Sequence, residues 1–235
     1  MKRKIFFDTE FIETNGVFFD NMGNKVILPI LELISIGMID QNGKEYYAVS
    51  KDFDYNRAYN DNWIRENVLI NLFPQSYIDK DLLNKYGKCN ANIADDIKDY
   101  IYEPILCDKC NSHMTYFEQT YWCEDNNCGN CKDLDDVEFN IEFLAYCGAT
   151  DFTNLYRIFD TKLLNIPKHF PWYFTDIRYL VDKHCDDHGI TRKQLKNHHM
   201  YPKNNKEHNA LDDAIWNKKL CDLLQILDDY GNKSK

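Results

Sequence analysis

Three segments with the pattern of β-strands occupy the first 50 residues, and they constrain the fold more than any other feature of the chain. Residues 4–12 (KIFFDTEFI) are aromatic and apolar, residues 30–39 (ILELISIGMI) are almost continuously apolar, and residues 44–50 (KEYYAVS) alternate between polar and apolar positions. The pair Asn42-Gly43 predicts a tight hairpin turn between the second and third segments. We therefore expect these segments to form one β-sheet.

The rest of the chain combines helical patterns with one further strand. Apolar residues recur at helical spacing, and the short apolar run FLAYC at 143–147 has the composition of a strand buried on both faces. Strands followed by alternating strand and helix predict an α/β protein, with a mixed sheet flanked by helices. The expected helical segments are 55–72 (with Trp63, Ile64, Val68 and Leu72), 91–102 (with Ile93, Ile97, Tyr100 and Ile101), 152–159, 174–185 and 209–228.

The composition excludes several classes of protein. At 235 residues, 44% of them hydrophobic, the chain fits one large globular domain or a domain with a small insert. Its net charge of −10 excludes a globally basic protein that coats nucleic acid through bulk charge. No apolar run approaches the roughly 20 residues of a membrane span, and the apolar part of the N-terminal MKRKIFF is too short for a secretory signal. We therefore expect a cytoplasmic protein that does not bind membranes.

Asp8 and Glu10 lie two positions apart on the first expected strand, so both carboxylates should point to the same face of the sheet. Two carboxylates on an apolar strand repel each other and are costly to desolvate, and a divalent cation would offset that cost. The spacing alone is a weak signal, because loop acids such as Asp52 and Asp54 share it. The apolar sequence around Asp8 and Glu10 is what favours a metal site.

Further acidic residues could join this pair. Asp151 follows the last expected strand, where open α/β sheets place ligands, although an aspartate here could instead cap the next helix. His208 and Asp213 flank the start of the final helix, for which Asn209 could serve as the cap. Asp212 and Asp213 are adjacent, so only one of them can face the same site.

Asp8, Glu10, Asp151 and Asp213 would together supply hard oxygen ligands, which suit Mg²⁺ or Mn²⁺. Two divalent ions roughly cancel the charge of four carboxylates, and ions about 3.5–4 Å apart can clamp the attacking and leaving oxygens of a phosphodiester. His208 belongs to the residue type that titrates near neutral pH, and it could take the proton from the attacking water. This constellation predicts a metal-dependent phosphodiester hydrolase.

Three motifs, FFDTEF at 6–11, AYCGATD at 145–151 and HNALDDA at 208–214, resemble those of the DEDDh 3′→5′ exonucleases, which have a ribonuclease H-like fold. Within that family the chain is most similar to the bacterial polyadenylate-specific exoribonuclease AS type. The similarity covers most of the chain outside residues 103–137. The other segments that carry it are DTEFIE at 8–13, ELISIG at 32–37, EYYAVS at 45–50, WIRENVL at 63–69 and HNALDDAIWNKKL at 208–220.

The resemblance implies a two-metal mechanism and a substrate. The implied substrate is the 3′ end of a single-stranded RNA, and the implied products are nucleoside 5′-monophosphates. The resemblance also makes a homodimer the oligomeric state to test. Of Asp212 and Asp213, the resemblance selects Asp213, because the family motif has four residues between its histidine, here His208, and its aspartate. The implied roles are that Asp8 bridges both ions, Glu10 and Asp213 complete their shells, Asp151 holds the second ion, and His208 is the general base.

A cysteine-rich segment at 103–137 interrupts the pattern and holds five of the nine cysteines. Such crowding in a reducing compartment favours a metal site over disulfides. The short segments HMTYF and QTYW inside it have the pattern of a small hairpin, which is typical of a zinc ribbon. We expect an inserted zinc ribbon between exonuclease-domain segments 1–102 and 138–235.

Two Cys-x2-Cys pairs in this insert, Cys107/Cys110 and Cys128/Cys131, are separated by 17 residues, the spacing of a zinc site. Cys123 is a fifth candidate, because Cys123-x4-Cys128 could also close a tetrahedral site. Cys123 and Cys131 therefore compete for the fourth ligand position. The expected ion is one structural Zn²⁺, since an all-cysteine shell leaves no open position for catalysis.

A locally basic region could bind the RNA backbone: residues 152–206 carry ten lysines and arginines against five aspartates. Phe11 and Trp172 could stack on unpaired bases, and Arg178 could contact a phosphate. Two alternative functions stay open. One is the same chemistry on DNA, as a 3′→5′ exodeoxyribonuclease, and the other is a non-catalytic nucleic-acid-binding module.

Overall fold

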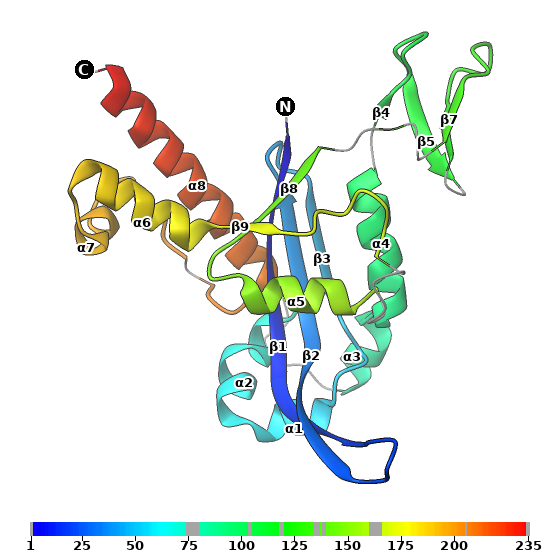
Figure 1. Ribbon diagram of the computed structural model, residues 1–235, viewed down its shortest axis with the longest axis vertical. Coiled ribbons are helices and arrows are strands. Elements are labelled where there is room, and N and C mark those ends of the chain that lie inside the picture. Colours follow the sequence, from blue (N-terminus) through cyan, green and yellow to red (C-terminus); the bar gives the residue numbers. More distant parts are fainter. Residues whose placement is uncertain are drawn as a thin grey trace.

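The structure is a computed structural model and describes residues 2–73, 80–102, 105–117, 120–133, 137, 140–159, 166–204 and 206–233. Its main sheet has five strands in the order β3-β2-β1-β8-β9 (Figure 1). β2 is antiparallel to both β1 and β3, whereas β8 and β9 add in parallel beside β1. This confirms the predicted mixed α/β sheet. The strands are β1 Arg3–Phe19, β2 Lys25–Asp40, β3 Glu45–Val49, β8 Ile141–Ala145 and β9 Phe174–Asp176.

The hairpin turn predicted at Asn42-Gly43 is confirmed. The Gly43 N–H donates to the Asp40 carbonyl at 3.0 Å, and Gly43 has a φ of +92°, a conformation that glycine adopts without steric cost. The side chain of Asp40 accepts hydrogen bonds from the backbone N–H groups of Asn42 and Lys44. These contacts fix the register of β2 against β3.

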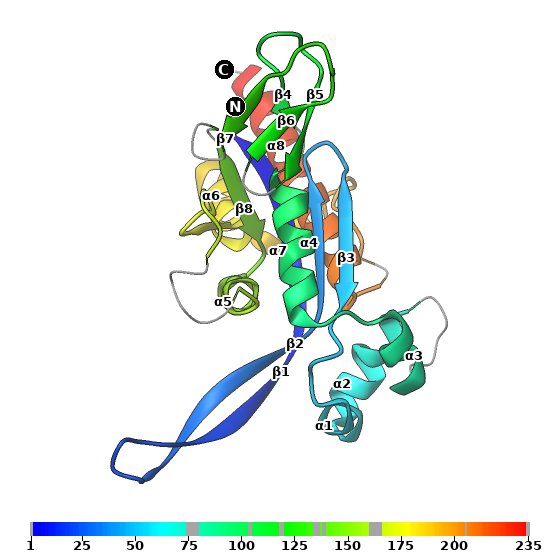
Figure 2. The same cartoon turned by 90° about the vertical axis from the view of Figure 1, so that its right-hand side faces the viewer.

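β1 and β2 are much longer than the strands that the sequence pattern predicts. Beyond the sheet they continue as a two-stranded arm that projects from the body of the protein (Figure 2). The arm turns at residues 20–23, where the Gly23 N–H donates to the Asp20 carbonyl at 3.0 Å. Phe19 and Met22 near its tip are 71% and 87% exposed.

Helices cover both faces of the sheet, as the side-chain alternation of the strands requires. Ile5 and Phe7 of β1 point to the face covered by α4 and α5. Phe6 of β1 and Leu144 of β8 point to the opposite face, which α6 and α8 cover. The bounds of these helices are α4 Asn90–Tyr102, α5 Ala149–Arg157, α6 Ile177–His188 and α8 Ala210–Lys233.

The single helix predicted over residues 55–72 is wrong. The segment forms three short pieces, and Asp61 separates the first two: its N–H bonds to the Arg57 carbonyl, and its side chain accepts from the Ile64 N–H. Trp63, one of the apolar residues at helical spacing in this segment, is 54% exposed. The pieces are α1 Tyr55–Asn60, α2 Asn62–Asn67 and the 3₁₀ turn η1 Leu69–Asn71, and a further helix, α3, spans Lys80–Tyr86.

The helix predicted over 174–185 is correct only in its second part. Residues 174–176 form β9, and α6 begins at Ile177 because the Asp176 side chain caps it by accepting from the Arg178 N–H at 2.8 Å. A short helix, α7 (Arg192–Lys196), follows α6 and is held by a capping box of Thr191 and Gln194. No sequence pattern predicted α7.

The cysteine-rich segment forms a second, smaller sheet in the order β4-β5-β6-β7. The predicted hairpin is confirmed, since β5 and β6 pair antiparallel. The sheet packs on the end of α4, where the Tyr102 and Tyr116 rings lie 5.1 Å apart and Tyr121 is fully buried. Figure 2 shows it at the opposite end of the protein from the arm. The strands are β4 Ile105–Leu106, β5 His113–Phe117, β6 Thr120–Cys123 and β7 Cys131–Asp133.

None of the helices in the described part of the chain has both the length and the apolar composition needed to cross a membrane.

Candidate active site

One edge of β1 is left open beside the candidate acidic residues. β8 pairs with β1 only from Arg3 to Phe6, so within the described residues no strand pairs with the following part of β1 on that side. Side chains from two helices satisfy this edge instead. The Thr9 N–H donates to Asp151 Oδ1 at 3.1 Å, and the Phe7 carbonyl accepts from Asn217 Nδ2 at 3.2 Å. These bonds attach α5 and α8 directly to the strand that carries Asp8 and Glu10.

Asp8, Glu10 and Asp213 come together at this edge. Each offers one carboxylate oxygen, and the three oxygens lie within 4.8 Å of one another. Glu10 is buried, although it is a charged residue type. Residues 205 positions apart in the sequence thus form one acidic group, as a metal site requires.

Gly37 on β2 allows α8 to approach the sheet. It lies directly opposite Asp8 in the β1–β2 register. A Cβ atom at this position would be 2.2 Å from the Leu211 nitrogen and 2.3 Å from the Ala210 carbonyl carbon. The start of α8 therefore rests on bare backbone, and this close approach brings Asp213 to Asp8.

Asp151 is the third residue of α5 and is not its cap, a position that Gly148 holds. Its Oδ1 accepts from both the N–H and the Oγ1 of Thr9, the latter at 2.6 Å. Asn154, one turn later, donates to the same Thr9 hydroxyl at 3.3 Å. These buried contacts hold the Asp151 carboxylate beside the other acids, although its oxygens are not within the 4.8 Å group.

Burial and neighbouring carboxylates disfavour the ionised forms of Asp8 and Glu10. Burial raises the pKa of Asp8 well above its usual range, and the charges of the other three acids raise it further. Burial, followed by the charges of Asp213 and Asp151, raises the pKa of Glu10 to about 8. Burial also raises the pKa of Asp213 to about 6, against hydrogen bonds that favour its ionised form. Such a group favours a divalent cation, because the cation replaces this mutual repulsion with attraction.

Asp213 and Asp212 take different places at the start of α8. Asp213 Oδ2 accepts from the His208 backbone N–H at 2.9 Å, and its Oδ1 accepts from the Asn204 amide. Asp212 lies outside the acidic group, with its carboxylate 3.9 Å from Lys206 Nζ. Asn209 caps the helix, since its Oδ1 accepts from the Asp212 N–H at 3.2 Å.

His208 has a left-handed backbone, with a φ of +68°. This conformation is uncommon for a residue with a side chain and is found at functional sites when neighbouring contacts hold it. Here the hydrogen bond from its N–H to Asp213 holds it. The imidazole lies edge-on to the Trp63 ring, with 4.8 Å between ring centroids.

A cavity of about 530 Å³ opens beside His208 and Asp213. Its size falls within the range that small ligands occupy. Aromatic side chains and one lysine surround it, and Trp216 is fixed there by a hydrogen bond from its Nε1 to the Pro202 carbonyl. The other lining residues are Tyr146, Lys196, Tyr201, Asn204 and Glu207.

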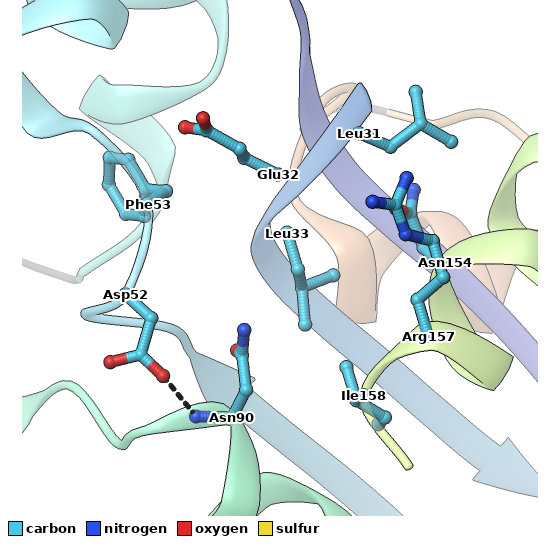
Figure 3. Close-up of a pocket in the computed structure, with 9 residues that line it drawn as sticks. All are labelled: Leu31, Glu32, Leu33, Asp52, Phe53, Asn90, Asn154, Arg157 and Ile158. Atoms are coloured by element: carbon cyan, nitrogen blue, oxygen red, sulfur yellow. Dashed lines mark hydrogen bonds between the residues drawn. The ribbon is translucent and has the colours of Figure 1, made fainter. Parts of the chain in front are cut away.

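A second cavity, of about 200 Å³, lies on the α5 side of the sheet (Figure 3). Arg157 and Asn154 of α5 face Leu31 and Leu33 of β2 across it. Asn154, which lines this cavity, also bonds to Thr9, the residue between Asp8 and Glu10.

The three predicted substrate-contact residues are not brought to one place. Phe11 follows Glu10 at a β-bulge and pairs with Leu33, so it lies at the edge of the site. Arg178 places its guanidinium 5.8 Å from the ring centre of Tyr146, which lines the larger cavity. Trp172 is 65% exposed and packs near Tyr156 of α5, away from α8.

Four of the five clustered cysteines gather in the small sheet. Cys107, Cys110, Cys123 and Cys128 each offer a sulfur atom within 4.8 Å of the others. Cys131 is exposed on β7 and lies outside this group.

Gly37, Asn217 and Trp63 also belong to the site, although no sequence pattern assigned them a role in it. A glycine inside a strand often marks a close backbone approach, so Gly37 did carry a signal. Asn217 lies four residues after Asp213 and therefore on the same side of α8, which was a second available signal. No local pattern placed Trp63 beside His208, because 145 residues separate them.

No known family model matches the chain. Two proteins of Mycobacterium tuberculosis, from strains CDC 1551 / Oshkosh and ATCC 25618 / H37Rv, are similar to it. Each is named a 3′-5′ exoribonuclease and is 25% identical to the chain over 228 residues, which cover 97% of this chain and 96% of the relative. The similarity is distant, but it extends over almost the entire chain.

Proposed function

We propose that this protein is a metal-dependent 3′→5′ exoribonuclease of the DEDDh type, with a ribonuclease H-like fold. The observation that carries the proposal is the acidic group of Asp8, Glu10 and Asp213, with Asp151 bonded to the adjacent Thr9. The names of the two distant relatives support the same activity. The strand order, with two strands added in parallel beside β1, supports the proposed fold.

The acidic residues suit hard divalent ions, because their ligand atoms are all carboxylate oxygens. Asp8, Glu10 and Asp213 would hold Mg²⁺ or Mn²⁺ directly, and Asp151 would hold a second ion, in keeping with its place next to the group. When bound, two such ions would stabilise the charge that develops on the attacking and leaving oxygens of the phosphodiester.

His208 is the proposed general base. Its imidazole lines the larger cavity, and its backbone bonds to Asp213, so the ring is held beside the acidic group. From that position it would take a proton from the attacking water. The contact with the exposed Trp63 ring restricts the orientation of the imidazole.

The larger cavity is the proposed place of the 3′-terminal nucleotide. Tyr146, Tyr201 and Trp216 offer aromatic surface to an unpaired base, and Lys196 offers a positive charge to its phosphate. We propose that the preceding backbone runs toward the second cavity, where Arg157 is available (Figure 3).

Digestion of end-labelled RNA tests the proposal. With Mg²⁺ or Mn²⁺, a 5′-labelled single-stranded RNA should shorten stepwise, and a 3′-labelled RNA should release labelled nucleoside 5′-monophosphate at once. EDTA should stop both reactions. Internal fragments, or cleavage that continues in EDTA, would contradict the proposal.

The same experiment separates the two alternative functions. Faster digestion of a DNA oligonucleotide of the same sequence would indicate an exodeoxyribonuclease. Binding of RNA without release of mononucleotides at any divalent ion concentration would indicate a binding module.

Stability without added divalent ions should fall as the pH rises from 6 to 8. The pKa of Glu10 is about 8 in the folded protein and near 4.5 in an unfolded chain, so the unfolded state loses its proton first. The contribution of Glu10 to the free energy of unfolding is therefore fully present below pH 4.5, and it is progressively lost as the pH rises to 8. The expected loss between pH 6 and 8 is on the order of 2 kcal/mol.

Urea denaturation at the two pH values measures this effect. Adding Mn²⁺ should restore stability mainly at pH 8, because the ion stabilises the ionised carboxylates. Glu10→Gln should flatten the pH dependence, and an unchanged slope in that variant would show that other groups cause it.

A further inference from the structure

The thiol cluster of the small sheet has the dimensions of a tetrahedral metal site. The sulfur atoms of Cys107 and Cys128 are 3.7 Å apart, and those of Cys110 and Cys123 are 3.3 Å apart. A disulfide would need about 2.0 Å. Four sulfur atoms at about 2.3 Å from a central zinc ion lie roughly 3.8 Å from one another, close to the observed separations.

The four cysteines lie on two turns that share one backbone pattern. In the first turn, the Cys107 N–H donates to the Ser112 carbonyl at 2.8 Å. In the second, the Cys123 N–H donates to the Asn130 carbonyl at 3.0 Å. In both turns the acceptor lies two residues beyond the second cysteine.

A left-handed residue also follows the second cysteine of each turn. Asn111 has a φ of +61° and Gly129 a φ of +57°. Glycine and asparagine are the residues that adopt this conformation at least cost. The repeated pattern pairs Cys123 with Cys128, in place of the Cys128/Cys131 pair that the sequence spacing offered.

A backbone N–H group two residues after each cysteine interacts with the sulfur atom of that cysteine. Donors of this kind orient the side chains that bind a metal ion. The Asn130 side chain adds a donor to Cys107 Sγ at 3.3 Å, and its second bond, to Asp108 Oδ1 at 3.0 Å, fixes its orientation. The backbone donors, each two residues after its cysteine, are Lys109, Ser112, Asp125 and Asn130.

We propose that Cys107, Cys110, Cys123 and Cys128 bind one structural zinc ion, and that Cys131 is not a ligand. Four thiolates complete a tetrahedral shell, so the ion holds the two turns together and has no open position for a substrate. The bound ion would fix the small sheet on α4, because Cys107 and Cys128 belong to the apolar contact that includes Tyr116 and Tyr121.

Zinc content of three matched proteins tests the ligand set. The full chain, Cys123→Ser and Cys131→Ser are purified without chelator, and zinc per chain is measured by mass spectrometry. We expect about one zinc ion in the unchanged protein and in Cys131→Ser, and loss of most of it in Cys123→Ser. Zinc retained in Cys123→Ser but lost in Cys131→Ser would overturn the ligand set, and iron in place of zinc would overturn the metal.

A spectroscopic measurement on the unchanged chain avoids any effect of the variants on folding. Protein produced with cobalt in place of zinc should show sulfur-to-Co²⁺ charge transfer and the visible bands of tetrahedral Co²⁺. Absence of these bands in cobalt-supplied protein would overturn the proposal. Both readouts are independent of RNA hydrolysis, so their failure would leave the proposed function untouched.

Discussion

Asp213→Asn should reduce RNA hydrolysis by about 10³-fold or more, whereas Asp212→Asn should leave it within a few-fold of the unchanged protein. Only Asp213 contributes an oxygen to the group with Asp8 and Glu10. Asparagine has the same shape but lacks the charge that a divalent ion requires. Losing a ligand that supports several kcal/mol of charge stabilisation in the transition state corresponds to this factor.

Asp212 is a matched control for Asp213, because it is the adjacent residue of the same helix. Both variants remove one carboxylate from the first turn of α8, so the change in formal net charge and the change in charge near the helix N-terminus are the same. The measurements are single-turnover rates with Mn²⁺ and the Mn²⁺ affinity of each variant. Full activity in Asp213→Asn together with loss in Asp212→Asn would show that the carboxylates are assigned the wrong way round.

Asp8 and Glu10 could be identified from the sequence because their relation is local. A strand places alternate side chains on one face, and the apolar neighbours identified the strand. The same local logic located α4 and the Asn42-Gly43 turn. Each of these features depends on a few consecutive residues.

Features that depend on distant contacts could not be derived in this way. Asp151 reads locally as a helix cap, but its carboxylate instead bonds to Thr9 at the open edge of β1, which exists because β8 ends at Ala145. The arm was missed for a similar reason. Asn15-Gly16 resembles a turn, but β1 continues through it because residues of β2 pair with it on the other side.

The four clustered sulfur atoms show the limit of cysteine spacing as a signal. Cys128-x2-Cys131 has the commoner spacing, yet Cys131 begins β7 and pairs with Trp122 across the sheet. That pairing directs it away from the other sulfur atoms. Cys123 ends β6, and the turn to Cys128 returns the chain to the cluster.

Gly37→Ala should reduce activity by about 100-fold while the protein stays folded. The added methyl group would lie 2.2–2.3 Å from backbone atoms of Leu211 and Ala210, which cannot rotate away as a flexible side chain can. The start of α8 must therefore shift by about 1 Å, and a shift of that size in a catalytic group can cost about 10²-fold in rate. The overpacking should also lower the free energy of unfolding by about 1–3 kcal/mol.

Gly43→Ala is the matched control for this loss of stability. Gly43 lies in the turn that joins β2 to β3. It has a φ of +92°, and no atom lies within 4 Å of an added Cβ. Alanine there is strained by about 1–3 kcal/mol but does not touch α8. Comparable unfolding midpoints with a large difference in kcat and Mn²⁺ affinity would show that Gly37 acts by positioning Asp213 and His208. If Gly37→Ala kept the activity and metal affinity of Gly43→Ala, the close approach of α8 to β2 would not be what assembles the site.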